Sequence, residues 1–154
     1  MSDIVVEQDE AAAAPDGLAQ LQEIFFGNKP YTGIGRTLKF RPVELEAGRV
    51  VFEGTPDDTV YNPIGTVHGG YAATLLDSAV GCAVHSRLAA NQGYTTLELK
   101  IAYHRALTRD SGTVRAEGTV VSIGSRVAFA EGRLTDGQGR LCVSATSTLL
   151  VFPR

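Results

Sequence analysis

The stretch from Asn62 to His85 constrains the fold most strongly. It opens with Asn-Pro and Gly, which break regular structure, passes through His68-Gly69-Gly70, and continues as about four helical turns of small or apolar residues. A helix that is apolar on nearly every side is usually covered by the rest of the protein. Asp77 is the only charged residue within these turns. We therefore expect a lone carboxylate on a buried or half-buried helix.

The composition indicates one ordinary globular domain. The chain has 154 residues, of which 44% are hydrophobic and 20% are charged, and this is enough for one sizeable core. Residues 1–15 hold four acidic residues and no basic one, so we expect a disordered acidic tail followed by a single domain over residues 16–154. The net charge of −3 argues against a nucleic-acid partner. Because we find neither a membrane-spanning run nor a signal sequence, we expect no membrane partner and a cytoplasmic protein.

The cysteines and histidines are not spaced as metal ligands. Cys82 and Cys142 stand far apart and suit a reducing compartment as small core residues. The three histidines also lack metal-ligand spacing. We therefore expect no metal and no bound cofactor.

Periodic patterns predict the remaining elements. Apolar residues at helical spacing predict a short helix between Asp16, its N-cap, and Gly27, its stop. Residues 35–55 read as two short strands, and the long helix should end near residue 87 or 89. Alternating apolar and polar residues then predict an antiparallel meander of four strands over residues 95–105, 113–122, 126–135 and 141–151.

An apolar helix followed by four strands favours an α+β architecture in which a curved antiparallel sheet wraps around the helix. This order of elements resembles the hotdog-fold acyl-CoA thioesterases of the phenylacetate-degradation-related (PaaI-like) group. The motifs that carry the resemblance are Asn62, His68-Gly69-Gly70, Asp77, and the segments 95–99 and 124–131. The resemblance implies a hotdog fold and hydrolysis of an acyl-CoA to a free acid and CoA, with CoA as part of the substrate.

The chemistry of these residues can be argued without the resemblance. Gly69 or Gly70, at the start of a helix, offers a backbone N–H that could polarise a thioester carbonyl. Asp77 could activate a water molecule or attack the carbonyl itself, and the sequence leaves both roles open. Burial should raise the pKa of this carboxyl, whereas nearby donors such as Asn62 should lower it.

Spacing indicates a site between subunits. His68 and Asp77 lie about 13 Å apart along a helix and point to nearly opposite sides, so one chain cannot easily bring both to one carbonyl. The resemblance implies the same arrangement, in a homodimer that is often paired into a homotetramer. It further implies that Asn62 and Thr95 orient the water or the acid and that His68 holds the thioester end. The turn expected to contact CoA comprises Gly124, Ser125 and Arg126.

Each of these residues also has a purely structural interpretation. His68 could cap the helix, Gly69 and Gly70 could satisfy a tight loop, and Asn62 could be a turn residue. Asp77 could pair with an arginine, and Arg126 could be a surface charge. Two other functions also stay open: a hydratase or dehydratase acting on an acyl thioester, and a non-catalytic acyl-CoA-binding protein.

Overall fold

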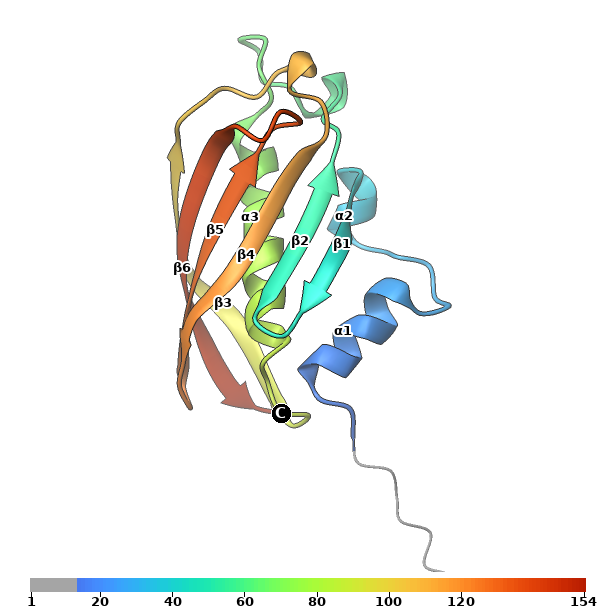
Figure 1. The fold of residues 1–154 in the computed structure, drawn as a ribbon, viewed down its shortest axis with the longest axis vertical. Coiled ribbons are helices and arrows are strands. Elements are labelled where there is room, and N and C mark those ends of the chain that lie inside the picture. The colour runs from blue at the N-terminus through green and yellow to red at the C-terminus, as the bar shows by residue number, and fades with distance from the viewer. Residues whose placement is uncertain (1–13) are drawn as a thin grey trace, which may run out of the picture.

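The computed structural model describes residues 14–154, so most of the predicted acidic tail lies outside the described residues. Figure 1 shows a six-stranded antiparallel sheet that curves around one long helix, α3 (Gly69–His85). This is the predicted α+β hotdog architecture. The helix ends a few residues earlier than expected, where the N–H of Ser86 bonds the carbonyl of Cys82.

The order of strands corrects the predicted meander. Across the sheet the strands are β1 (Phe40–Glu46), β2 (Arg49–Gly54), β4 (Val114–Ile123), β5 (Val127–Thr135), β6 (Leu141–Pro153) and β3 (Gln92–Tyr103). The meander is therefore right for β4 to β6 and wrong for β3, which pairs with β6 at the far edge. The long connection over residues 104–113 crosses the end of the sheet, so β2 can occupy the place beside β4 (Figure 1).

The core lies between α3 and the concave face of the sheet. Tyr71, Leu75 and Val80 of the helix are at most 3% exposed and belong to the apolar clusters formed with the sheet. The approach is closest at Gly118 of β4, where an added Cβ atom would lie 2.3 Å from the carbonyl carbon of Ala79. The small residues of α3 therefore let the sheet close tightly around the helix.

The N-terminal part covers the other edge of the sheet. Helix α1 (Gly17–Phe26) begins and ends as predicted, with the Asp16 side chain accepting from the N–H of Ala19 at 3.0 Å and Gly27 as the C-cap. Three short helical segments were not expected: α2 (Ile34–Thr37), η1 (Asp58–Val60) and η2 (Arg109–Ser111). Within residues 14–154, no helix has the length and apolar character needed to cross a membrane.

Strand β3 forms an exposed edge of the sheet. Its pairing with β6 contains a bulge between Thr96 and Glu98, so Leu97 does not share a face with Leu99 as the alternation predicted. Leu97 is 59% exposed and Tyr103 is 55% exposed. A long edge strand with exposed apolar side chains is a surface on which another strand can pair.

Candidate active site

His68 begins helix α3. Its main-chain N–H bonds the carbonyl of Val60 at 2.8 Å, and its Nδ1 accepts from the N–H of Gly70 at 2.8 Å. The predicted capping role of His68 is therefore confirmed. Since Nδ1 acts as an acceptor, this hydrogen bond assigns the proton of the neutral ring to Nε2, which can donate to a ligand.

The hydrogen bond that caps the helix decides which of the two glycines can donate to a ligand. The N–H of Gly70 is already used by His68, whereas the N–H of Gly69 makes no hydrogen bond with any residue of the range 14–154. The first N–H groups of a helix point outward at the positive end of its dipole. Gly69 is thus the better placed of the two for a developing oxyanion.

Tyr103, at the end of β3, contacts the carbonyl group of Gly69. Its hydroxyl donates to the carbonyl of Gly69 at 2.8 Å, and a Cβ atom on Gly69 would lie only 2.9 Å from that hydroxyl. Burial raises the pKa of Tyr103, so the hydroxyl keeps the proton that it donates. The sequence does not single out Tyr103, because its contact with Gly69 depends on which strand lies beside the start of α3.

Asp77 lies two turns further along α3 and is exposed, which corrects the expected burial. No other part of the described chain covers this side of the helix, because β3 is the edge of the sheet. Among residues 14–154, no basic side chain lies within ion-pair distance of Asp77, so the arginine pairing considered from the sequence is not found there. Its partner is the hydroxyl of Thr96, which donates to Oδ1 at 3.0 Å.

The hydroxyl beside the acid was predicted one residue too early. Thr95 pairs with the outward-facing Leu150 and is exposed, whereas Thr96 pairs with the fully buried Leu149 and points toward α3. Successive side chains of a strand alternate between its faces, so only one of the two can reach Asp77. The structure therefore gives this contact to Thr96.

Cys82 is the one thiol near the acid. Burial, and then the charge of Asp77, raises the pKa of Cys82 to about 12. The thiol is therefore protonated at neutral pH and a poor nucleophile. Asp77 is the reactive group that this part of the helix offers.

Asn62 orders the loop that leads into His68. Its side-chain oxygen accepts from the N–H groups of Ile64 and Thr66, and its Nδ2 donates to the Thr66 hydroxyl at 3.0 Å. All of these partners belong to its own turn, as the structural interpretation of Asn62 expected. A contact of Asn62 with the attacking water stays a prediction.

The turn of Gly124, Ser125 and Arg126 lies far from His68 in the same chain. The carbonyl of Arg126 accepts from Val151, near the start of β3, whereas the end of β3 contacts Gly69. The turn and the start of α3 are therefore at opposite ends of the molecule (Figure 1). One chain cannot bring both to the same thioester.

A cavity of about 490 Å³ opens beside the start of α3. It is bounded by the His68-Gly69-Gly70 corner and by the segment after β3, including His104 and Arg105. Within the described residues, no three histidine, cysteine or acidic side chains gather as a metal site would require. The corner thus offers N–H donors and space for a ligand.

Residues 64–143 match the sequence pattern of the thioesterase superfamily. The chain belongs to this superfamily. The matched segment contains the His68-Gly69-Gly70 corner, Asp77 and Thr96. Because all these residues lie inside it, the geometry described above is that of a thioesterase domain.

Relatives agree with this assignment. A 71-residue stretch is 45% identical to a Halobacterium salinarum protein that carries a provisional esterase name, and the match spans 44% of either chain. Over 119 residues, 77% of this chain and 95% of the relative, it is 25% identical to a 1,4-dihydroxy-2-naphthoyl-CoA hydrolase of Listeria monocytogenes. The PaaI protein of E. coli shares the fold with a TM-score of 0.76, at 17% identity over 88% of this chain and 94% of that one.

Within one chain of this thioesterase the candidate groups form two half-sites. One half-site is the corner of His68 and Gly69, and the other is Asp77 with Thr96. They lie about 12 Å apart along α3, too far to act together on one carbonyl. Both half-sites lie beside the exposed strand β3.

Proposed function

We propose that the protein hydrolyses acyl-CoA thioesters to a free acid and CoA, in a site that two copies of the chain share. The observation that carries this proposal is the position of the two half-sites. Both open at the uncovered β3 edge, but at different levels along α3. A second copy that pairs with this edge would supply the half-site that each copy lacks.

The register of such a pairing follows from the contacts of β3. Tyr103 marks the level of Gly69, and Thr96 marks the level of Asp77. An antiparallel pairing of two β3 strands, centred between Leu99 and Lys100, places Thr96 opposite the partner's Tyr103. Asp77 then lies level with the partner's Gly69. The same pairing covers the exposed edge of each sheet, which favours a homodimer.

The reaction then uses groups from both copies. The carboxylate of Asp77 either takes a proton from a water molecule that attacks the thioester carbonyl or attacks that carbonyl itself. Negative charge moves onto the carbonyl oxygen, where the N–H of the partner's Gly69 and the dipole of its α3 stabilise it. The C–S bond then breaks, and CoA leaves as a thiolate that takes up the proton lost by the water molecule. Where Asp77 attacks the carbonyl itself, the acyl group is left as a mixed anhydride on Asp77, and a water molecule hydrolyses it to the free acid and restores the carboxylate. The partner's His68, which can donate from Nε2, holds the thioester end.

The shared site also explains the position of the predicted CoA contact. In the proposed dimer, the antiparallel pairing of the two β3 strands places the turn of Gly124, Ser125 and Arg126 of one copy near His68 of the other. Arg126 and the turn's backbone N–H groups suit the phosphates of CoA. A solved structural neighbour from Streptococcus mutans, with a TM-score of 0.68, was crystallised bound to acetyl-CoA, which supports a CoA ligand. Pairing of two dimers into a tetramer is part of this proposal.

The experiment that tests the proposal is release of free CoA from a panel of short, branched, long and aromatic acyl-CoA esters, followed with a thiol reagent. We expect turnover with at least one member of the panel. Binding of acyl-CoA without release of CoA would instead identify an acyl-CoA-binding protein. Hydration of an unsaturated acyl group without release of CoA would identify a hydratase.

A further inference from the structure

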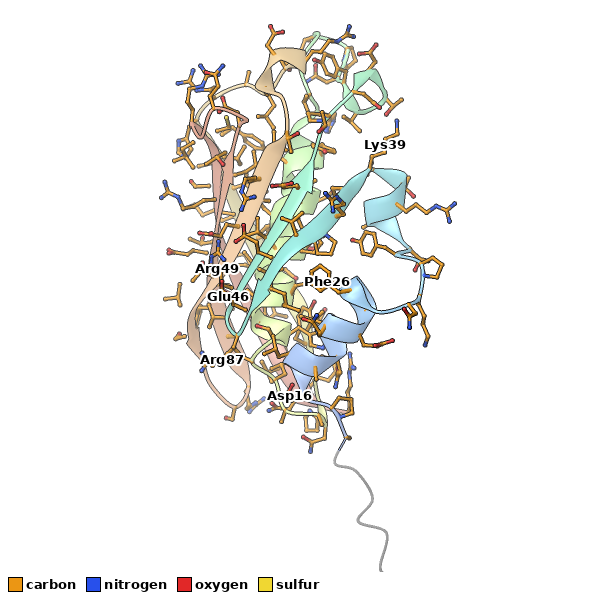
Figure 2. All side chains as sticks on the ribbon, turned by 45° about the vertical axis from the view of Figure 1, so that its right-hand side comes forward. Asp16, Phe26, Lys39, Glu46, Arg49 and Arg87 are labelled. Carbon is orange, nitrogen blue, oxygen red and sulfur yellow. The ribbon has the colours of Figure 1, made fainter. Side chains whose placement is uncertain are left out.

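A second cavity lies at the edge of the sheet away from β3. It has a volume of about 470 Å³ and is formed by α2, the start of β1 and the end of β2. Among residues 14–154, three basic residues line it, Arg36, Lys39 and Arg41, and Glu53 is the only acidic one. Figure 2 shows Lys39 where the chain passes from α2 into β1. The cavity is separate from the proposed thioester site.

Two of the three positive charges have no acidic partner within the described residues. Lys39 pairs with Asp57, and Glu53 pairs with Arg115 of β4 rather than with Arg41, its direct neighbour across the strand pair. In the part of the chain that the structure describes, neither Arg36 nor Arg41 makes an ion pair. The cavity therefore carries two uncompensated guanidinium groups on a protein whose net charge is −3.

The backbone at Lys39 is held in an unfavourable conformation. Its φ of 57° is the only positive φ of a non-glycine residue among residues 14–154. Glycine is the usual residue in this conformation just after the end of a helix, because a Cβ atom is crowded there. Strain of this kind is frequent at ligand-binding sites. Lys39 is one of the residues that line the cavity.

Two tyrosine hydroxyls lie close to glycines of the cavity lining, that of Tyr31 as part of the lining and that of Tyr71 behind it. A Cβ atom on Gly35 would lie 2.3 Å from the hydroxyl of Tyr31, and one on Gly54 would lie 2.2 Å from the hydroxyl of Tyr71. The Tyr71 hydroxyl is buried and has no hydrogen-bond partner among the described residues. Burial raises the pKa of both phenols, that of Tyr71 to about 12, so both keep their protons. Tyr31 thus adds a hydroxyl donor to the lining of the cavity.

We propose that this cavity binds a phosphate-bearing small molecule, with Arg36 and Arg41 holding the phosphate. Two unpaired guanidinium groups match the charge of a phosphate dianion, and each can bind two of its oxygens at once. A carboxylate would neutralise only one of them. The phosphate could belong to a free nucleotide or to CoA itself, and the experiment separates these two sources.

The test is calorimetric titration of the full chain with inorganic phosphate, ADP and CoA at constant ionic strength. We compare the wild type with the double variant Arg36→Ala/Arg41→Ala and with Arg87→Ala. Arg87 is an exposed arginine at the far end of the sheet (Figure 2). We expect phosphate to bind the wild type and Arg87→Ala alike, and the double variant at least about 10-fold more weakly, since two charge-assisted contacts are lost.

Equal phosphate binding by the double variant and the wild type, or no binding of phosphate to the wild type, would overturn the proposal. Loss of ADP affinity with unchanged CoA affinity in the double variant would identify a separate nucleotide as the ligand. Loss of CoA affinity would identify the phosphates of CoA. Because phosphate, ADP and CoA are titrated in the absence of any acyl ester, the result is independent of the proposed hydrolysis.

Discussion

The peptide group between Gly69 and Gly70 is held at both ends. Its carbonyl, that of Gly69, receives the Tyr103 hydroxyl, and its N–H, that of Gly70, is captured by His68. The Gly69 N–H that we assign to the oxyanion belongs to the preceding peptide group, which shares the Cα atom of Gly69 with this one. We therefore expect Tyr103 to position the donor through Gly69, because a small rotation at this residue would turn the N–H away from the carbonyl oxygen.

Replacing Tyr103 tests this dependence. Tyr103→Phe keeps the ring over Gly69 but removes the hydrogen bond, so we expect kcat to fall about 10-fold with little change in KM. The control is Tyr94→Phe, which removes the other tyrosine hydroxyl of β3, the one beside Gly81. The kcat and KM of both variants are measured by steady-state kinetics. Equal kcat values in the two variants would show that Tyr103 has no positioning role.

Asp77→Asn tests the acid. The change keeps the size of the side chain but removes both the base and the nucleophile, so kcat should fall by at least about 100-fold. Because Asp77 is exposed and has a hydroxyl partner but no basic partner in the described chain, the melting temperature should stay close to that of the wild type. Hydrolysis and thermal unfolding are measured on the same preparation. A variant that stays active but is destabilised would end the catalytic assignment.

At this scale the sequence predicted that the corner begins α3 and that the acid lies further along the same helix, because both are carried by a local motif; their catalytic roles stay predictions. It could not find Tyr103, whose role depends on β3 running back along α3. It also chose Thr95 over Thr96, because the face on which each hydroxyl lies is set by the register with β6. The exposure of Asp77 could not be predicted either, because it depends on β3 being the last strand of the sheet, and the sequence of the helix carries no information about the order of the strands.

Helix α1 is attached to the end of α3 by a small contact that contains a histidine. Nε2 of His85 lies 3.0 Å from the Gln20 side-chain oxygen, and its ring packs against Tyr94 at 5.6 Å. Burial, and then the charge of Arg154, lowers the pKa of His85 below its ordinary value of 6.5. The folded protein therefore resists protonation of this ring.

This contact predicts a pH dependence of stability. Below the unfolded pKa of 6.5 the unfolded chain binds a proton at His85 more readily than the folded chain does. The stabilisation is therefore complete above this pH and is lost as the pH falls toward the lowered pKa of the folded state. Urea unfolding at pH 7.5, 6.5 and 5.5 should show a decline that is smaller in His85→Gln. Parallel curves for both proteins would contradict the assignment.

At the scale of elements, the sequence predicted α1, α3 and the positions of all six strands. Hydrophobic periodicity is a local property and identifies each element by itself. The pairing of β3 with β6 is not local, because the long connection after Tyr103 allows β3 to lie at either edge. The short helix α2 has too few residues for a periodic pattern and was missed.

The exposed edge of β3 predicts how two molecules meet. If the two strands pair about a point between Leu99 and Lys100, a cysteine at position 100 lies near its copy in the partner. We expect Lys100→Cys to form a disulfide-linked dimer under mild oxidation, whereas Glu46→Cys, on β1 at the other edge, should not. The native cysteines should not interfere, because Cys142 is buried and Cys82 is partly buried. If the protein sediments as a monomer and still hydrolyses acyl-CoA, the proposal of a site shared by two copies is wrong.

The shared site is tested most directly by mixing two inactive variants. Asp77→Asn removes the acid, and Gly69→Val crowds Tyr103 and the oxyanion donor, so each homodimer should be inactive. A mixed dimer holds one intact site, built from the Asp77 of one copy and the Gly69 of the other. After joint unfolding and refolding of equal amounts, we predict a return to about one quarter of wild-type activity, since half of the dimers are mixed and each has one working site of two. A mixture as inactive as its two components would contradict the account.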